Sequence, residues 1–209
     1  MPRYDAATEA NFAVAEGLLP ETGLALLAAR ATRENLLDAL EALESPLFAM
    51  THGRPDRLLA QDGGRALGLP DVALLAGRAT FAYACHTAHE LGEAAAAVHG
   101  HWWGYTGSIG APDVSSEFLP LFTRIFSFLR DAFPSARSAW EKSEVLSRIA
   151  DLCREAEERV TDFWMDDADL DIGSALFCLM HIWQRLRVWG PGASAPLMHP
   201  EAPPPIFLL

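Results

Sequence analysis

Residues 47–92 read LFAMTHGRPDRLLAQDGGRALGLPDVALLAGRATFAYACHTAHELG and contain two short apolar runs. The first run, residues 47–51, is followed by His52. The second run, residues 79–84, is followed by Cys85. Short apolar runs with aromatic and β-branched residues are typical of buried strands. We therefore expect two strands, one ending at a histidine and the other at a cysteine.

The sequence around these runs alternates between predicted strands and predicted helices. Residues 24–29 are apolar and predict a further buried strand, and residues 101–109 predict another that ends in glycines. Between them, residues 33–44 carry leucines at helical spacing after Thr32, which can cap a helix, and residues 89–99 are alanine-rich. Short strands alternating with helices indicate an α/β fold with a mostly parallel sheet flanked by helices.

Other segments complete this outline. Residues 56–64 predict a strand and a turn, and residues 69–77 a short helix or an irregular crossover. The C-terminal part is predicted to be helical, over residues 117–133, 139–164 and 170–189.

The chain divides into three predicted parts. Residues 1–135 form the α/β core, and residues 136–190 form C-terminal helices packed on the core. Residues 191–209 form a proline-rich, extended tail. Its last four residues, 206–209, are apolar and are expected to dock on the domain or on a partner.

Composition limits the partners and the compartment. Half of the residues are apolar and the net charge is −12, so a packed core is expected and no basic surface attracts nucleic acid. The longest apolar run is far shorter than a membrane span, which needs about 20 residues. The three cysteines have no disulfide-like spacing, and no secretory leader is visible. A cytoplasmic protein without membrane contact is the simplest interpretation.

The two strand ends carry residues suited to thiol chemistry. In open parallel sheets, ligands bind beyond the carboxyl ends of the strands, and neighbouring strands lie about 4.8 Å apart. If the strands are neighbours, His52 can accept the proton of Cys85 or stabilise its thiolate. Gly53 permits a sharp turn there, and its backbone N–H, with that of Cys85, is a candidate oxyanion hole.

Structural roles compete with this interpretation. A cysteine on an apolar strand is commonly a small buried hydrophobe, and a histidine at a strand end is commonly held by a structural hydrogen bond. Cys153 and Cys178 lie on apolar helix faces and are expected to be inert. The alternative to an enzyme is therefore an α/β scaffold that acts as a protein-interaction module.

A metal site is a further alternative at the same place. Cys85, His86 and His89, with His99 and His101 downstream, are donor types that bind zinc. Their spacing matches no compact zinc motif, so we expect neither a metal nor another cofactor. Motifs typical of serine hydrolases, phosphate-binding loops and dinucleotide-binding folds are also missing from the sequence.

Three stretches follow one another in a characteristic order. Residues 24–54, LALLAARATRENLLDALEALESPLFAMTHGR, read as strand, helix, strand and His-Gly. Residues 79–88, ATFAYACHTA, read as a strand that ends in Ala-Cys-x-Thr, and residues 101–113, HWWGYTGSIGAPD, read as the strand that follows. In this order the three stretches resemble CHAT domains, a family of caspase-like cysteine peptidases. The likeness covers about residues 24–130. The chain departs from the pattern in the 33 residues between the histidine and the cysteine, fewer than the roughly 50 of caspases.

The resemblance implies a cysteine endopeptidase that cleaves a protein substrate, in bacteria commonly within signalling or defence systems. Cys85 would attack the peptide carbonyl, and His52 would act as general base and then protonate the leaving amine. The backbone N–H groups of Gly53 and Cys85 would hold the oxyanion. Asp113 and Glu117 would bind a basic substrate side chain; alternatively, they complement the dipole of the helix that follows. A regulatory partner would bind the C-terminal helices or the tail.

Overall fold

A four-stranded sheet forms the centre of the molecule. The computed structural model describes residues 1–19, 23–163 and 170–204. The strands lie in the order β1-β5-β6-β7; β1 pairs with β5 and β5 with β6 in parallel, whereas β6 and β7 are antiparallel. They span Leu47–Met50 (β1), Ala79–Tyr83 (β5), His101–Tyr105 (β6) and Leu186–Trp189 (β7).

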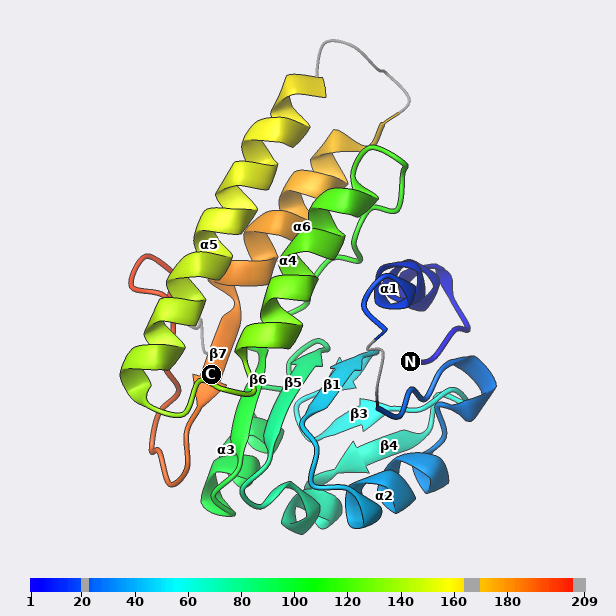
Figure 1. Cartoon of the computed structure of the whole chain (residues 1–209), viewed down its shortest axis with the longest axis vertical. Helices are drawn as coiled ribbons and strands as arrows, with labels where there is room; N and C mark the ends of the chain where they lie inside the picture. The colour runs from blue at the N-terminus through cyan, green and yellow to red at the C-terminus, as the bar shows by residue number, and fades with distance from the viewer. Residues whose placement is uncertain (20–22, 164–169, 205–209) are drawn as a thin grey trace.

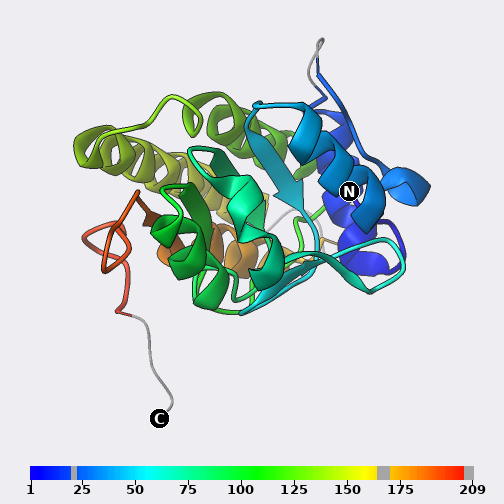
Figure 2. The same cartoon turned by 90° about the horizontal axis from the view of Figure 1, so that it is seen from below.

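Helices cover both faces of this sheet (Figures 1 and 2). One layer contains α1 (Ala6–Glu16), α4 (Leu119–Ala132), α5 (Ala139–Asp162) and α6 (Ile172–Gln184). The other contains α2 (Arg33–Ala42), the 3-10 helix η2 (Leu69–Leu75) and α3 (Glu90–Ala97). After β1 the chain forms a small antiparallel sheet of β2 (Gly53–Arg54), β3 (Arg57–Leu59) and β4 (Arg65–Gly68). A 3-10 turn, η1, spans Ala28–Arg30, before α2.

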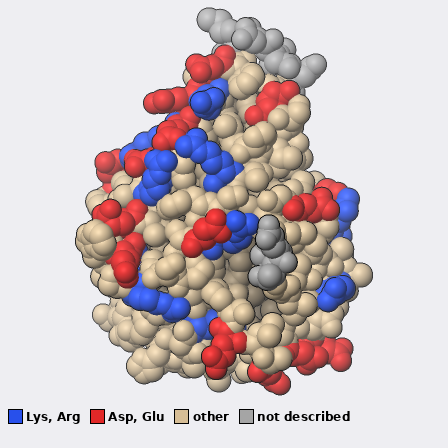
Figure 3. Space-filling view, viewed as in Figure 1, with Lys and Arg blue, Asp and Glu red and all other residues tan. Residues whose placement is uncertain are grey.

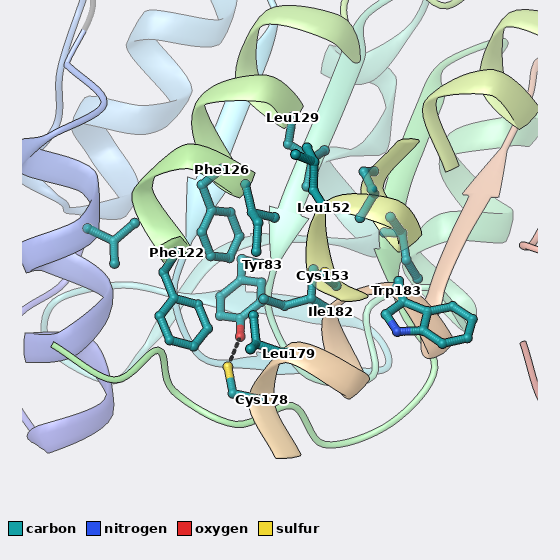
Figure 4. Packing of buried hydrophobic residues seen from close by; sticks show 14 of the residues in the cluster. Tyr83, Phe122, Phe126, Leu129, Leu152, Cys153, Cys178, Leu179, Ile182 and Trp183 are labelled. Carbon is teal, nitrogen blue, oxygen red and sulfur yellow. Dashed lines mark hydrogen bonds between the residues drawn. The ribbon is translucent and has the colours of Figure 1, made fainter. Parts of the chain in front are cut away.

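The alternation of side chains along β5 creates two cores. Phe81 and Tyr83 pack into the cluster under α4, α5 and α6, whereas Ala82 and Ala84 face the helices on the other side. The small alanines let α3 and η2 approach the second face closely. In the first core, Tyr83 lies among Phe126 and other apolar side chains (Figure 4). The hydroxyl of Tyr83 donates to the carbonyl of Gly110 at 2.6 Å.

The structure confirms the predicted α/β class with its mostly parallel sheet and helical C-terminal part. The predicted helices over 33–44, 89–99, 117–133 and 139–164 are present with slightly shorter bounds. Thr32 caps α2 as expected, because its side chain accepts a hydrogen bond from the N–H of Asn35 at 3.2 Å. Most of the fold was therefore predictable from strand patterns and helix caps in the sequence.

The strand predicted over residues 24–29 is wrong. This segment forms irregular backbone that ends in η1, and it has no ladder with β1. The N–H of Ala28 donates instead to the carbonyl of Met1 at 2.7 Å, and the carbonyl of Ala31 accepts from the N–H of Gln61. The segment is thus held at the periphery by the N-terminal residues rather than in the sheet.

The long helix predicted over 170–189 is also wrong at its C-terminal end. The helix α6 ends at Gln184, and Leu186–Trp189 pairs with β6 as an antiparallel strand. All four residues of β7 are buried, and a short run buried on both faces gives no periodicity that separates strand from helix. Residues 136–190 therefore supply a strand to the sheet in addition to their helices.

The surface carries charges of both signs. On the face shown in Figure 3, acidic and basic side chains are interspersed over the helices. Within the described ranges, no helix has both the length and the apolar composition needed to cross a membrane. The tail follows the sheet as far as an isolated bridge between Leu197 and Val188. The predicted docking of residues 206–209 lies outside the described residues.

Candidate active site

The parallel pairing of β1 and β5 brings the two predicted catalytic residues to the same edge of the sheet. Met50 and Tyr83 are register partners, and the N–H of Thr51 donates to the carbonyl of Tyr83 at 3.1 Å. The chain then continues to His52 on one strand and to Cys85 on the other. Both side chains are partly exposed. The sequence-based expectation that these strands are neighbours is confirmed.

Gly53 is packed directly against the cysteine segment. A Cβ atom at this position would lie 2.5 Å from the carbonyl oxygen of Cys85 and 2.6 Å from Cγ2 of Thr87. Gly53 lies opposite Leu58 in the antiparallel pair of β2 and β3. The N–H of Leu59 donates to the carbonyl of His52, and hydrogen-bonded pairs alternate with non-bonded pairs along an antiparallel ladder. Gly53 and Leu58 therefore form a non-bonded pair. The N–H of Gly53 therefore points away from β3.

The side chain of His52 has a carboxylate partner that the sequence did not suggest. Nε2 of His52 lies 2.7 Å from Oδ2 of Asp5, and the ring of Tyr4 lies 5.7 Å from the imidazole, between centroids. Asp5 is the N-cap of α1, where its side chain accepts from the N–H of Thr8 at 2.9 Å. The capping pattern is visible in the sequence, but the 47-residue contact with His52 is set by how α1 docks.

Asp5 is ionised at neutral pH. The N–H of Thr8 lowers the pKa of this carboxyl to about 2, and the hydrogen bond from His52 contributes in the same direction. An ionised carboxylate on Nε2 favours the tautomer with the proton on that nitrogen, because the carboxylate can only accept. Nδ1 is then the basic nitrogen of the ring. An aspartate thus orients the ring of His52.

Cys85 is the partly exposed member of the three free cysteines. Its Sγ accepts a long hydrogen bond, 3.4 Å, from the N–H of Ile109. The other two thiols are enclosed: burial raises the pKa of Cys178 to about 12 and raises that of Cys153 well above its usual range. The expectation that those two are inert is consistent with this burial.

A tight turn presents Cys85 at the end of β5. The next residue, His86, adopts a φ of +63°, which residues other than glycine adopt rarely. The turn is anchored by Ala88, whose N–H donates to the carbonyl of Tyr105 at 3.0 Å and whose carbonyl accepts from Nε1 of Trp189 at 2.7 Å. Among the described residues, the N–H of Cys85 has no hydrogen-bond partner. Over the described residues, the N–H groups of Gly53 and Cys85 thus have no backbone acceptor, and their role as an oxyanion hole stays a prediction.

The neighbouring histidines are held by the loop that follows β6. Nε2 of His86 lies 3.3 Å from the hydroxyl of Ser108, and Nε2 of His89 lies 2.7 Å from the carbonyl oxygen of Thr106. Burial lowers the pKa of His86, and the neighbouring His89 and Arg185 lower it further. His101 begins β6, at the opposite end of the sheet from Cys85. Over the described residues, no group of three or more potential ligands is placed to bind a metal.

The two predicted substrate-binding carboxylates lie in the segment between β6 and α4. Oδ1 of Asp113 accepts from the N–H of Ser115 at 2.7 Å, which forms a local turn. The exposed Glu117 accepts from the hydroxyl of Ser116 at 2.7 Å. Both carboxylates thus have hydrogen-bond partners within the few residues that precede α4. The same segment contacts Cys85 through the N–H of Ile109. The role of Asp113 and Glu117 in substrate binding remains a prediction.

His52 and Cys85 do not bond to each other in this structure. In the described part of the chain, His52 pairs with Asp5, while the thiol contacts Ile109. The two predicted catalytic residues therefore follow neighbouring strands, but their side chains have different partners. Catalytic hydrogen bonds in free enzymes are often long and tighten only when substrate binds. No protein-family model, curated protein or solved structure matches this chain.

Proposed function

We propose that this protein is a cysteine endopeptidase in which Cys85 is the nucleophile and His52 is the general base, as the resemblance to CHAT domains implies. The observation that carries the proposal is the carboxylate–imidazole pair of Asp5 and His52 at the same sheet edge as a partly exposed thiol. A base oriented by a third group beside a nucleophile is the arrangement that activates thiols. Asp5 extends the predicted dyad to three residues.

The proposed reaction proceeds through a thioester. His52 takes the thiol proton at Nδ1, and Sγ of Cys85 forms a bond with the carbonyl carbon of the substrate. The N–H groups of Gly53 and Cys85 stabilise the oxyanion. His52 then protonates the leaving amine as the C–N bond breaks, and a water molecule activated by His52 hydrolyses the thioester. Asp113 or Glu117 binds a basic substrate side chain.

A second function, a non-catalytic interaction module, is favoured by two observations. His52 and Cys85 each have another partner, Asp5 and Ile109, rather than each other. A large apolar side chain on α5, that of Trp140, is 71% exposed and offers a contact for a partner protein. In this alternative the imidazole is a structural ligand of α1, and the thiol has no chemical role.

Labelling with a peptidyl acyloxymethyl ketone, followed by mass spectrometry, separates the two functions. We expect Cys85 to be alkylated selectively, Cys85→Ala to abolish labelling, and His52→Ala to slow it by roughly 10²-fold or more. Asp5→Asn, which retains a capping side chain, is expected to slow labelling by about tenfold. Cys178→Ala serves as the matched control and should leave labelling unchanged, because Cys178 is buried. Labelling of Cys85 that is indifferent to His52→Ala would support the interaction module.

A further inference from the structure

An apolar cavity of about 730 Å³ runs along the outer edge of β1. Every residue from Leu47 to Thr51 lines it in succession. Because successive side chains of a strand point to opposite faces of the sheet, a cavity that touches all of them lies beside the strand. β1 is the end strand of its sheet, so no strand of this sheet covers that side.

The helical layers extend beyond β1 on both sides of the cavity. Ala39 and Leu40 of α2 line one side, and Leu18 and Phe133 line the other. The irregular segment 24–27 forms the opposite wall. The space between the two layers is therefore bounded above, below and at its far side, as the position of a further strand would be. A cavity of this size lies within the range of ligand-binding pockets, about 300–1,000 Å³.

Unpaired backbone groups face this space. In a parallel ladder, alternate residues bond to the neighbour on one side, and Thr51 bonds to β5. Phe48 and Met50 therefore direct their N–H and C=O groups to the outer edge. Over the described residues, neither has a hydrogen-bond partner there. Met50 is only 1% exposed, and buried backbone groups without partners are rare and destabilising.

We propose that this cavity binds an extended apolar peptide segment of another protein, which adds to β1 as a further strand. A peptide pairs the free N–H and C=O groups of Phe48 and Met50, whereas an acyl chain of the same volume leaves them unpaired. The chain's own segment 24–27 is fixed on the far wall, where Ala28 hydrogen-bonds to Met1. Apolar side chains at the rim offer a docking surface: Leu19, Leu24 and Leu43 are each more than 40% exposed.

This site is separate from the proposed peptidase centre. Neither His52 nor Cys85 lines the cavity, so the bound segment is held without being presented to the thiol. The inference therefore does not depend on the proposed function. The binding experiment is carried out in both the wild-type protein and Cys85→Ala, and equal affinity is expected.

The probe is a synthetic peptide of alternating valine and leucine with a lysine at each end, and its twin carries N-methyl groups on alternate residues. Fluorescence anisotropy measures affinity, and hydrogen exchange reports on the amides of Phe48 and Met50. At ten times the dissociation constant we expect exchange of these two amides to slow by roughly tenfold. The N-methylated twin cannot complete the ladder, so it should bind at least about tenfold more weakly.

A matched pair of variants on α2 tests the location. Ala39→Trp fills the cavity and should weaken binding by about tenfold or more, whereas Ala42→Trp, at an exposed position outside the lining, should not change it. Equal binding of both peptides would overturn the proposal. Binding of laurate but not of the peptide would identify an acyl site instead. Slow exchange of Phe48 and Met50 together with residues 24–27 in the free protein would show that the chain's own segment occupies the edge.

Discussion

Gly53 sets how closely the two strand ends approach. Its Cα faces the backbone of Cys85, and a methyl group would lie 2.5 Å from the carbonyl oxygen of Cys85 and 2.9 Å from the Cβ of Ala84. Both neighbours belong to the backbone or to a short rigid side chain, so they cannot move aside without shifting the turn. The glycine is thus required by contact and not by an unusual φ.

The substitution Gly53→Ala is expected to lower the free energy of unfolding by about 1–3 kcal/mol, because it overpacks this contact. It should also slow thiol labelling of Cys85 by displacing the turn. Gly173→Ala is the matched control: the nearest atom to its added Cβ is Oδ1 of Asp171 at 3.7 Å, an ordinary contact. Urea unfolding measures both variants. Equal stability of the Gly53 variant and the wild type would contradict the close packing described here.

The positions of some residues in the candidate site were predictable from the sequence, and those of others were not. The placement of His52 and Cys85 at one edge of the sheet was predictable, because each follows an apolar run and parallel strands end at one edge. Asp5 was not, because its contact with His52 depends on the docking of α1 across 47 residues of chain. Capping chemistry identifies Asp5 as a helix start, but no local pattern indicates what else a capping carboxylate touches.

At the scale of elements, α1 has two roles that can be separated by substitution. Asp5→Ala removes both the cap and the partner of His52, and it should destabilise the protein by about 1 kcal/mol. Asp5→Asn retains a capping oxygen and should be closer to the wild type in stability, while it lacks the carboxylate charge that contacts Nε2 of His52. Thermal unfolding and thiol labelling of the two variants test this. Equal destabilisation by both would show that the charge, not the cap, stabilises α1.

The two segments that sequence reasoning assigned wrongly are both short. Residues 24–29 are wholly apolar, whereas 186–189 contain Arg187, and only the second segment pairs in the sheet. Local propensity cannot decide this, because the choice depends on which edge of the sheet is free and on what else the backbone bonds to. The longer helices were predictable since their caps and apolar faces repeat over several turns.

Strand β7 fixes the turn that carries Cys85. Nε1 of Trp189 donates to the carbonyl of Ala88 in a buried hydrogen bond. Trp189→Phe leaves that carbonyl without its donor and should lower the free energy of unfolding by about 1–3 kcal/mol. It should also speed hydrogen exchange of residues 85–89. Trp140→Phe, at a position 71% exposed, is the control and should change neither quantity. Unchanged exchange in the Trp189 variant would show that the turn is held by its other contacts.

Among the buried histidines of the molecule, His101 and His181 have strongly lowered pKa values. His101 begins β6 and lies near Lys142 and Arg137; its Nδ1 has no partner among the described residues. His181 lies on α6 against the ring of Phe177. Burial lowers the pKa of each imidazole to about 4, and nearby positive charges act in the same direction: Lys142 and Arg137 for His101, and Arg185 for His181. Both rings are therefore neutral in the folded protein above that pH.

These two pKa values predict acid destabilisation that begins near pH 6.5, before most carboxylates titrate. Between pH 6.5 and about 4 the unfolded chain binds a proton at each histidine and the folded protein does not, so stability falls as the pH is lowered. Each histidine contributes on the order of 1–3 kcal/mol across this window, and neither contributes above it. Urea unfolding at pH 7, 5.5 and 4.5 measures the slope.

His101→Asn removes one of the two titrations. The number of protons that the chain takes up on unfolding between pH 6.5 and 4 should therefore fall by about one, and the pH dependence of stability should weaken accordingly. His99→Asn is the control: His99 is exposed and has a φ of +62°, a conformation that asparagine accepts readily. An unchanged slope in the His101 variant would mean that this imidazole is protonated in the folded state. The positive charge of Lys142 would then need a counterion that reaches the start of β6, and the packing between α5 and the sheet would have to open to admit it.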